Sequence, residues 1–153
     1  SFLDPAVLKH FKKCDEIWHA GDIGNESVLD QLKAFKPTRA VYGNIDSHII
    51  RKECPLHQRF TSEDVDVWIT HIGGYPKRYS PFIQKEIETN PPQLFICGHS
   101  HILKVMYDKK LSLLHMNPGA AGKNGFHKVR TLLRFTIDGR EIKDLEVIEL
   151  GKR

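Results

Sequence analysis

The sequence has few of the features that mark secreted, membrane-spanning or disulfide-stapled proteins. Its 153 residues contain three cysteines, Cys14, Cys54 and Cys97, which are far apart and form no Cys-x-x-Cys motif. This spacing argues against a disulfide framework or a thiolate zinc site and fits a reducing cytoplasm. Apolar runs are short, and none approaches the roughly 20 residues that a membrane span needs. We therefore expect a cytoplasmic protein without membrane association.

An excess of charge of one sign is also missing. The chain has 23 basic and 19 acidic residues, for a net charge of +4, and its short basic groups are separated by acidic or apolar residues. Because no basic stripe with interleaved aromatic residues is present, dedicated nucleic-acid binding is not expected. The mild positive charge still favours anionic small molecules as substrates.

What is present is the composition of a globular domain, with 40% hydrophobic residues and no low-complexity run. A chain of this length buries about two thirds of its unfolded surface, so we expect one domain over residues 1–153. Hydrophobic periodicity and turn residues predict the elements. We expect helices at Asp4–Phe11, Ser27–Phe35 and Phe82–Ile87, and strands at Asp15–Ala20, Arg39–Tyr42, Val65–Thr70, Leu94–Cys97, Lys104–Asp108, Leu111–His115, Thr131–Ile137 and Glu141–Leu150.

The order of these elements predicts the fold class. The first half alternates strands and helices, whereas the second half contains strands only. This order is typical of an α/β protein in which two mixed sheets pack together with helices outside, an α/β/β/α four-layer sandwich.

Four successive strands of the first two thirds end in a polar group that can bind metal. These groups are Gly21-Asp22, Gly43-Asn44, Thr70-His71 and Gly98-His99-Ser100-His101. In open α/β sheets, ligand sites lie beyond the carboxyl ends of the strands. Imidazoles, a carboxylate and an amide oxygen, without thiolate, suit divalent Mn, Fe, Zn, Ni or Co. Five such ligands are too many for one open zinc site and suit a pair of ions about 3.5 Å apart.

Each residue also has a purely structural interpretation. Asp22 could cap the helix that begins near Asn25, Asn44 could occupy a left-handed turn, and His71 could be a hydrogen-bonded structural histidine. Two histidines in Gly-His-Ser-His at a strand end have little packing value. The order of all four groups along the chain therefore favours a metal centre.

These motifs resemble those of the calcineurin-like metallophosphoesterases, and in particular the small single-domain YfcE-like phosphodiesterase branch. The family signature runs Asp-x-His, Gly-Asp, Gly-Asn-x-Asp, His, Gly-His-x-His. The matching segments, with the branch's Asn-Pro-Gly, are Gly21-Asp22, Gly43-Asn44-Ile45-Asp46, His71, Gly98-His99-Ser100-His101 and Asn117-Pro118-Gly119. The resemblance spans nearly the whole chain.

The resemblance implies a role for each matching residue. Asp22 would bridge two metal ions, most readily Mn; Asn44, His71 and His99 would complete one site, and His101 would bind the other ion. Asp22, Asn44, His71 and His99 would form the catalytic core, and Asp46 would orient a ligand or its loop. His19, in the strand before Asp22, could support that core or simply pack.

Two departures from the family pattern matter. The opening Asp-x-His would fall immediately before Ser1, so we expect that the natural chain has an upstream segment with this motif and the first strand of the sheet. Related branches also carry a histidine after the Asn as a candidate general acid, and here the residue is Ile45. This difference favours phosphodiesters, or esters with acidic leaving groups, as substrates.

The sequence thus predicts a two-metal phosphodiesterase in which a water between the ions attacks phosphorus directly as hydroxide. The alternatives are a catalytically weak metal-binding scaffold for protein partners, like the retromer subunit of the same superfamily, and a metal-dependent nuclease. Substrate choice would depend on the loops Ile72–Ser80 and Asn117–His127. Relatives form dimers or tetramers, so a homodimer or homotetramer is expected.

Overall fold

The structure is a computed structural model that describes residues 3–153, which form four α-helices and eleven β-strands. The helices are α1 (Pro5–His10), α2 (Glu26–Phe35), α3 (His48–Glu53) and α4 (Gln84–Thr89). The strands are β1 (Ile17–His19), β2 (Thr38–Ala40), β3 (His57–Ser62), β4 (Val65–Thr70), β5 (Gly74–Tyr75), β6 (Arg78–Tyr79), β7 (Leu94–Ile96), β8 (Lys104–Asp108), β9 (Leu113–Asn117), β10 (Val129–Asp138) and β11 (Glu141–Lys152).

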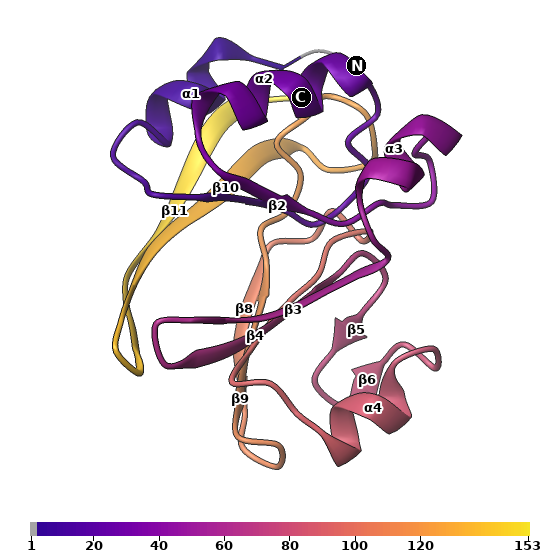
Figure 1. The fold of residues 1–153 in the computed structure, drawn as a ribbon, viewed down its shortest axis with the longest axis vertical. Helices are drawn as coiled ribbons and strands as arrows, with labels where there is room; N and C mark the ends of the chain where they lie inside the picture. Colours follow the sequence, from indigo (N-terminus) through magenta and orange to yellow (C-terminus); the bar gives the residue numbers. More distant parts are fainter. Residues whose placement is uncertain (1–2) are drawn as a thin grey trace.

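A five-stranded mixed sheet in the order β3-β4-β7-β9-β8 forms one layer of the molecule (Figure 1). Its inner strands β4, β7 and β9 are parallel, and the edge strands β3 and β8 pair antiparallel to them. Leu94, Phe95 and Ile96 of β7 are all buried, because both faces of a central parallel strand are covered. The parallel register brings the carboxyl ends of β4 and β7 to the same edge, where the site lies.

The second layer consists of two strand pairs. β1 pairs parallel with β2, and β10 pairs antiparallel with β11. Within residues 3–153 no strand pairing joins β1 to β10, and a cleft of about 1140 Å³ is lined by residues of both strands, including Trp18 and Phe135. The expected sandwich of sheets and helices is therefore confirmed, with the second sheet divided in two.

A shared core holds the two layers together. Val41, Ile69 and Ile96 are buried in one cluster against Trp18 of β1 and Phe135 of β10. The ring centroids of Trp18 and Phe135 lie 5.7 Å apart in an edge-to-face arrangement. Burial of such aromatic surface is the main favourable term that fixes one layer on the other.

Helix α1 begins where its capping residues predict. The Asp4 side chain accepts a hydrogen bond from the Ala6 N–H at 2.9 Å, and Pro5 takes the first position of α1. The Arg130 guanidinium of β10 donates to the same Asp4 carboxylate at 2.8 Å, which fastens α1 over the second layer (Figure 1). None of the described helices is long and apolar enough to cross a membrane.

Some element boundaries were wrong. β9 covers residues 113–117 instead of 111–115, α4 begins two residues later than expected, and α3 and β3 were not predicted. α3 has one buried side chain, Ile50, and β3 has none, so neither segment carries a clear hydrophobic pattern.

Candidate metal centre

The candidate centre lies where β1, β2, β4 and β7 end. Glycine precedes three of the four predicted ligand groups, and two of these glycines are required by close packing. A Cβ on Gly21 would overlap the His71 imidazole, and one on Gly43 would overlap the Asp22 carboxylate and backbone. The glycines thus let four chain segments approach closely enough to share one site.

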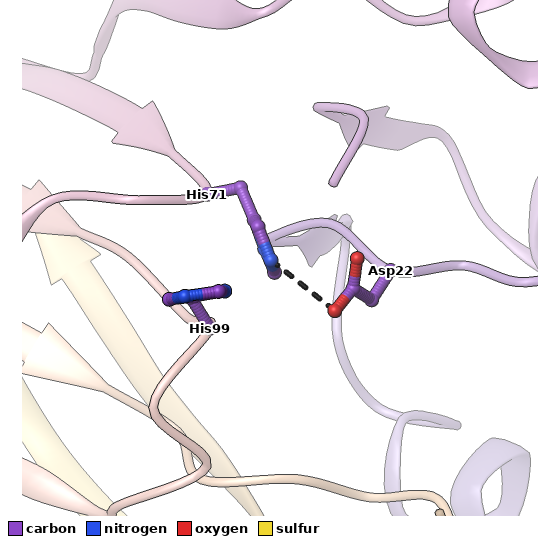
Figure 2. Close-up of side chains that lie close together, drawn as sticks. All are labelled: Asp22, His71 and His99. Atoms are coloured by element: carbon purple, nitrogen blue, oxygen red, sulfur yellow. Dashed lines mark ion pairs between the residues drawn. The ribbon is translucent and has the colours of Figure 1, made fainter. Parts of the chain in front are cut away.

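The donor atoms of Asp22, His71 and His99 lie within 4.8 Å of one another. Figure 2 shows the His71 imidazole directed at the Asp22 carboxylate, with His99 beside them. The Asp22 Oδ2 and His71 Nε2 atoms are 3.2 Å apart. Asn44 Oδ1 lies 2.9 Å from His71 Nε2 and 3.0 Å from His99 Nδ1. The first four predicted ligands therefore converge.

Hydrogen bonds fix which nitrogen of His71 faces the centre. His71 Nδ1 lies 2.7 Å from the Ala20 carbonyl, and only a protonated nitrogen can donate to that oxygen. In the neutral ring the lone pair then belongs to Nε2, which faces Asp22 and Asn44. A backbone acceptor on the outer nitrogen is the usual support of a metal-binding histidine.

The Asp22 and His71 pKa values move in opposite directions. Burial disfavours the His71 imidazolium, but the hydrogen bonds to Asp22 and the Ala20 carbonyl and the Asp22 charge outweigh it and raise the pKa of His71. Burial likewise opposes ionisation of Asp22, but hydrogen bonds from His71 and the Ile45 N–H lower its pKa. Both pKa directions favour the ion pair in the metal-free protein, so a cation that binds His71 competes with a proton.

Two polar residues behind the ligands hold their loops. The buried Asp46 carboxylate accepts from the Gly24 N–H and from the Gly43 N–H, each at 2.7 Å. It therefore joins the loop of Asp22 to the loop of Asn44. His19 Nδ1 accepts from the Gly21 N–H at 3.1 Å, which supports the turn that presents Asp22.

Asn117 braces the loop that carries the paired histidines. Its buried side-chain amide donates to the Gly98 carbonyl at 3.0 Å and to the Ser100 hydroxyl at 3.2 Å. Its oxygen accepts from the Gly119 N–H at 3.0 Å. The Asn-Pro-Gly segment is thus part of the scaffold of the centre.

His101 is the one predicted ligand outside the cluster of donor atoms. Its ring packs edge-to-face on His127, with centroids 5.2 Å apart. Sequence reasoning placed His127 at the end of a substrate loop and gave it no role. Its position ten residues after Asn117, with no strand end before it, offered no signal.

The structure removes two of the purely structural interpretations, those of Asp22 and Asn44. The cap of α2 is Asn25, whose side chain accepts from the Ser27 N–H at 2.7 Å, so Asp22 is free of that task. Asn44 does not have a left-handed backbone, whereas Asp22, His99 and His101 do, with φ of 58°, 69° and 61°. Side chains held in this uncommon conformation are typical of functional sites.

A family model, described as calcineurin-like phosphoesterase superfamily domain, matches residues 1–140. The chain belongs to this superfamily. It is a metallophosphoesterase family, and the converging imidazoles, carboxylate and amide oxygen fit a divalent cation. Phosphoesterases are hydrolases, so the family and the cluster together indicate a metal-binding hydrolase.

Similar proteins agree with this placement. A probable metallophosphoesterase of Methanothermobacter thermautotrophicus is 27% identical over 153 residues, which cover 99% of this chain and 85% of that protein. An archaeal phosphodiesterase structure matches with a TM-score of 0.74 at 18% identity, over 95% of this chain and 90% of that chain. Vps29 from Entamoeba histolytica in complex with Zn²⁺ matches with a TM-score of 0.75 at 12% identity, over 99% and 91%. At these identities the two structures establish the fold.

Proposed function

We propose that this chain is a phosphodiesterase that uses two divalent ions, with Mn²⁺ the first choice and Fe, Zn, Ni or Co as alternatives. The convergence of Asp22, Asn44, His71 and His99 at the carboxyl ends of the strands carries the proposal. Membership in a phosphoesterase superfamily supplies the reaction class.

Each ligand has a distinct part. Asp22 would hold both ions; its Oδ2 lies 3.2 Å from His71 Nε2, and its Oδ1 accepts from the Ile45 N–H at 3.1 Å. Asn44, His71 and His99 would hold the first ion. Because an amide oxygen and neutral imidazoles carry no charge, they would leave positive charge on that ion to attract an anionic phosphoester.

When bound, the two ions supply an acidified water as nucleophile and neutralise charge on the phosphoryl oxygens. The protein holds the ligands before substrate arrives. Asp46 and His19 fix the loops behind the ligands, so little reorganisation is needed during the reaction.

The surroundings of Ile45 favour diesters. This side chain occupies the position of the histidine in related branches and is 61% exposed at the rim of the centre. Because an aliphatic side chain cannot donate a proton, a leaving group there departs without help from this position. Esters with acidic leaving groups tolerate that loss best.

Hydrolysis of bis-p-nitrophenyl phosphate tests the proposal. The protein, expressed with any residues that its gene encodes before Ser1, should turn over this diester with added Mn²⁺ and should act more slowly on the monoester p-nitrophenyl phosphate. His99→Ala should abolish turnover, whereas the exposed His48→Ala should not. No metal-dependent turnover, or full turnover by His99→Ala, would refute the proposal.

A second candidate is a protein-binding scaffold. It is favoured by the similarity to Vps29, a protein named for vacuolar sorting, at a TM-score of 0.67 to 0.75. Under this alternative the chain binds metal but hydrolyses neither ester. We also propose that the chain forms a homodimer or homotetramer; light scattering after size exclusion tests this, and a monomer at micromolar concentration contradicts it.

A further inference from the structure

The two edge strands of the five-stranded sheet differ in what they present to solvent. The exposed positions of β3, at one edge, are polar: His57, Arg59 and Thr61. At the other edge, β8 has three successive exposed apolar residues, Val105 at 39%, Met106 at 41% and Tyr107 at 57%. Native edge strands commonly carry charges, prolines or bulges that prevent pairing with another chain, and the middle of β8 has no charge or proline.

The backbone of β8 also has groups available for a further strand. Leu114 of β9 donates its N–H to the carbonyl of the residue that precedes β7, at 2.9 Å. Residues along a strand bond alternately to its two neighbours, so His115 bonds to β8, where its partner is Met106. Val105 and Tyr107 then direct their N–H and C=O groups away from β9, where no strand of residues 3–153 pairs with them.

A second copy of the chain complements this edge. Two β8 strands related by a two-fold axis at Met106 run antiparallel, with Lys104 opposite the partner subunit's Asp108. An axis perpendicular to the sheet keeps each side chain on its own face, so the register can change only in steps that preserve the alternation of faces. The next register, centred on Tyr107, would place Lys104 opposite the partner subunit's Lys110. Charge therefore selects the register centred on Met106.

The side chains of β8 fit this register on both faces. Lys104 and Asp108 lie on the face of the β5–β6 hairpin, where Lys104 Nζ is 4.3 Å from the centre of the Tyr75 ring. Asp108 Oδ2 accepts from the hydroxyl of Tyr79 in the same hairpin at 2.7 Å. Opposite charges thus meet on this face, and β-branched and aromatic side chains meet on the other.

The hydrogen bonds of the pair lead to the same register. Val105 lies opposite the partner subunit's Tyr107, and two opposed residues with outward backbone groups exchange both of their N–H···O=C bonds. The symmetry repeats this exchange on the other side of Met106. All the outward backbone groups of Val105 and Tyr107 in both copies are then paired.

We propose that β8 is the contact between two copies of this chain, which pair antiparallel about Met106 into one continuous sheet. This inference rests on the proposed homo-oligomer and assigns its surface. Because the same patch is used on both subunits and β3 at the far edge is polar, pairing closes at two copies. A tetramer needs a second surface in addition.

Disulfide cross-linking of single-cysteine substitutions tests the register. At the two-fold axis the Cα atoms of a non-hydrogen-bonded pair lie about 4.5 Å apart, within reach of a disulfide. Met106→Cys should therefore give a covalent dimer under mild oxidation. Tyr107→Cys is the matched control, because its two copies would be roughly 7–8 Å apart, and the cross-link should be lost. The wild-type protein, with its three free cysteines, gives the background.

Charge on the edge gives a second test, with sedimentation velocity measured over a concentration series. Val105→Lys introduces a charge twice into a symmetric interface, so the dimer dissociation constant should rise roughly 30-fold. Thr61→Lys makes a comparable change on β3 and should leave the dimer as in wild type. Circular dichroism shows whether each variant is folded.

Three results would overturn the inference: a monomeric wild-type protein, a dimer that Val105→Lys leaves unchanged, or no covalent dimer from Met106→Cys. A wild-type dimer that passes neither variant test would refute only the place of the contact and leave the proposed homodimer. The proposed phosphodiesterase activity fails separately, because it depends on diester turnover and on His99→Ala.

Discussion

The two halves of the centre differ in how the fold holds them. The half formed by Asp22, Asn44, His71 and His99 follows directly on strand ends, and the outer nitrogen of His71 and both oxygens of Asp46 bond to backbone groups. The other half has one predicted ligand, His101, which lies on a loop held by Asn117 and packs its ring on His127. The sheet therefore fixes the positions of the first four ligands, whereas the position of His101 depends on a loop.

The largest expected effect comes from the residue that both halves share. Asp22→Asn keeps the shape of the side chain but removes its charge, so both ions should bind more weakly. Diester turnover should fall by about a thousandfold, since metal stabilisation of the reaction is worth several kcal/mol. Steady-state kinetics and metal content measure this, with the exposed Asp30→Asn as control. Loss of only one ion would show that Asp22 does not bridge.

The next effect concerns packing in the first half. Gly43→Ala forces a methyl group into the Asp22 backbone and should destabilise the protein by about 1–3 kcal/mol while displacing the ligand. Gly122→Ala is the matched control. Chemical denaturation and Co²⁺ titration separate the two effects, and equal stability of the two variants would contradict the observed close approach.

A smaller effect sharpens the comparison by acting on one half alone. Asp46→Asn exchanges one acceptor oxygen for an NH₂ group, so one of the Gly24 and Gly43 N–H groups loses its partner. The first ion should bind about 10- to 100-fold more weakly, because its ligands lose support. The second ion should be affected less. An equal loss for both ions would indicate that the halves are not independent.

The smallest effect is a pH dependence of the metal-free protein. The raised pKa of His71 adds stability below the ordinary histidine value of 6.5, which is lost as the pH rises through the folded pKa. The lowered pKa of Asp22 adds stability above 3.8, which is lost as the pH falls through the folded pKa. The ion pair therefore contributes most between pH 3.8 and 6.5.

Urea unfolding of the metal-free protein across pH 3.5–8 measures this contribution. The difference in unfolding free energy between wild type and Asp22→Asn should be largest in that window. A difference that does not vary with pH would contradict the ion pair. Co²⁺ affinity should fall on the acid side, because protons then compete for His71.

The convergence of the first four ligands was predictable from the sequence, whereas the contact between His101 and His127 was not. Asp22, Asn44, His71 and His99 stand at the ends of strands, so the order of motifs along the chain fixes where they meet. His127 reaches its place through a loop whose course depends on Gly125 and on contacts with His101. Such contacts follow from tertiary packing and leave no periodic trace in the sequence.

The same distinction applies to the fold. Strong apolar patterns, such as that of β7, predicted the central sheet. The half-exposed β3 and the six-residue α3 were missed because their hydrophobic patterns are weak. The division of the second layer into two strand pairs is a matter of pairing between distant segments, which single-sequence patterns do not encode.

The left-handed backbones of Asp22, His99 and His101 have an evolutionary consequence. Each costs roughly 1–2 kcal/mol that a glycine at the same position would recover. Selection for thermal resistance alone would therefore replace these three residues with glycine and lose the chemistry. A thermostable homologue with glycine at these three positions would indicate a lineage that no longer depends on catalysis.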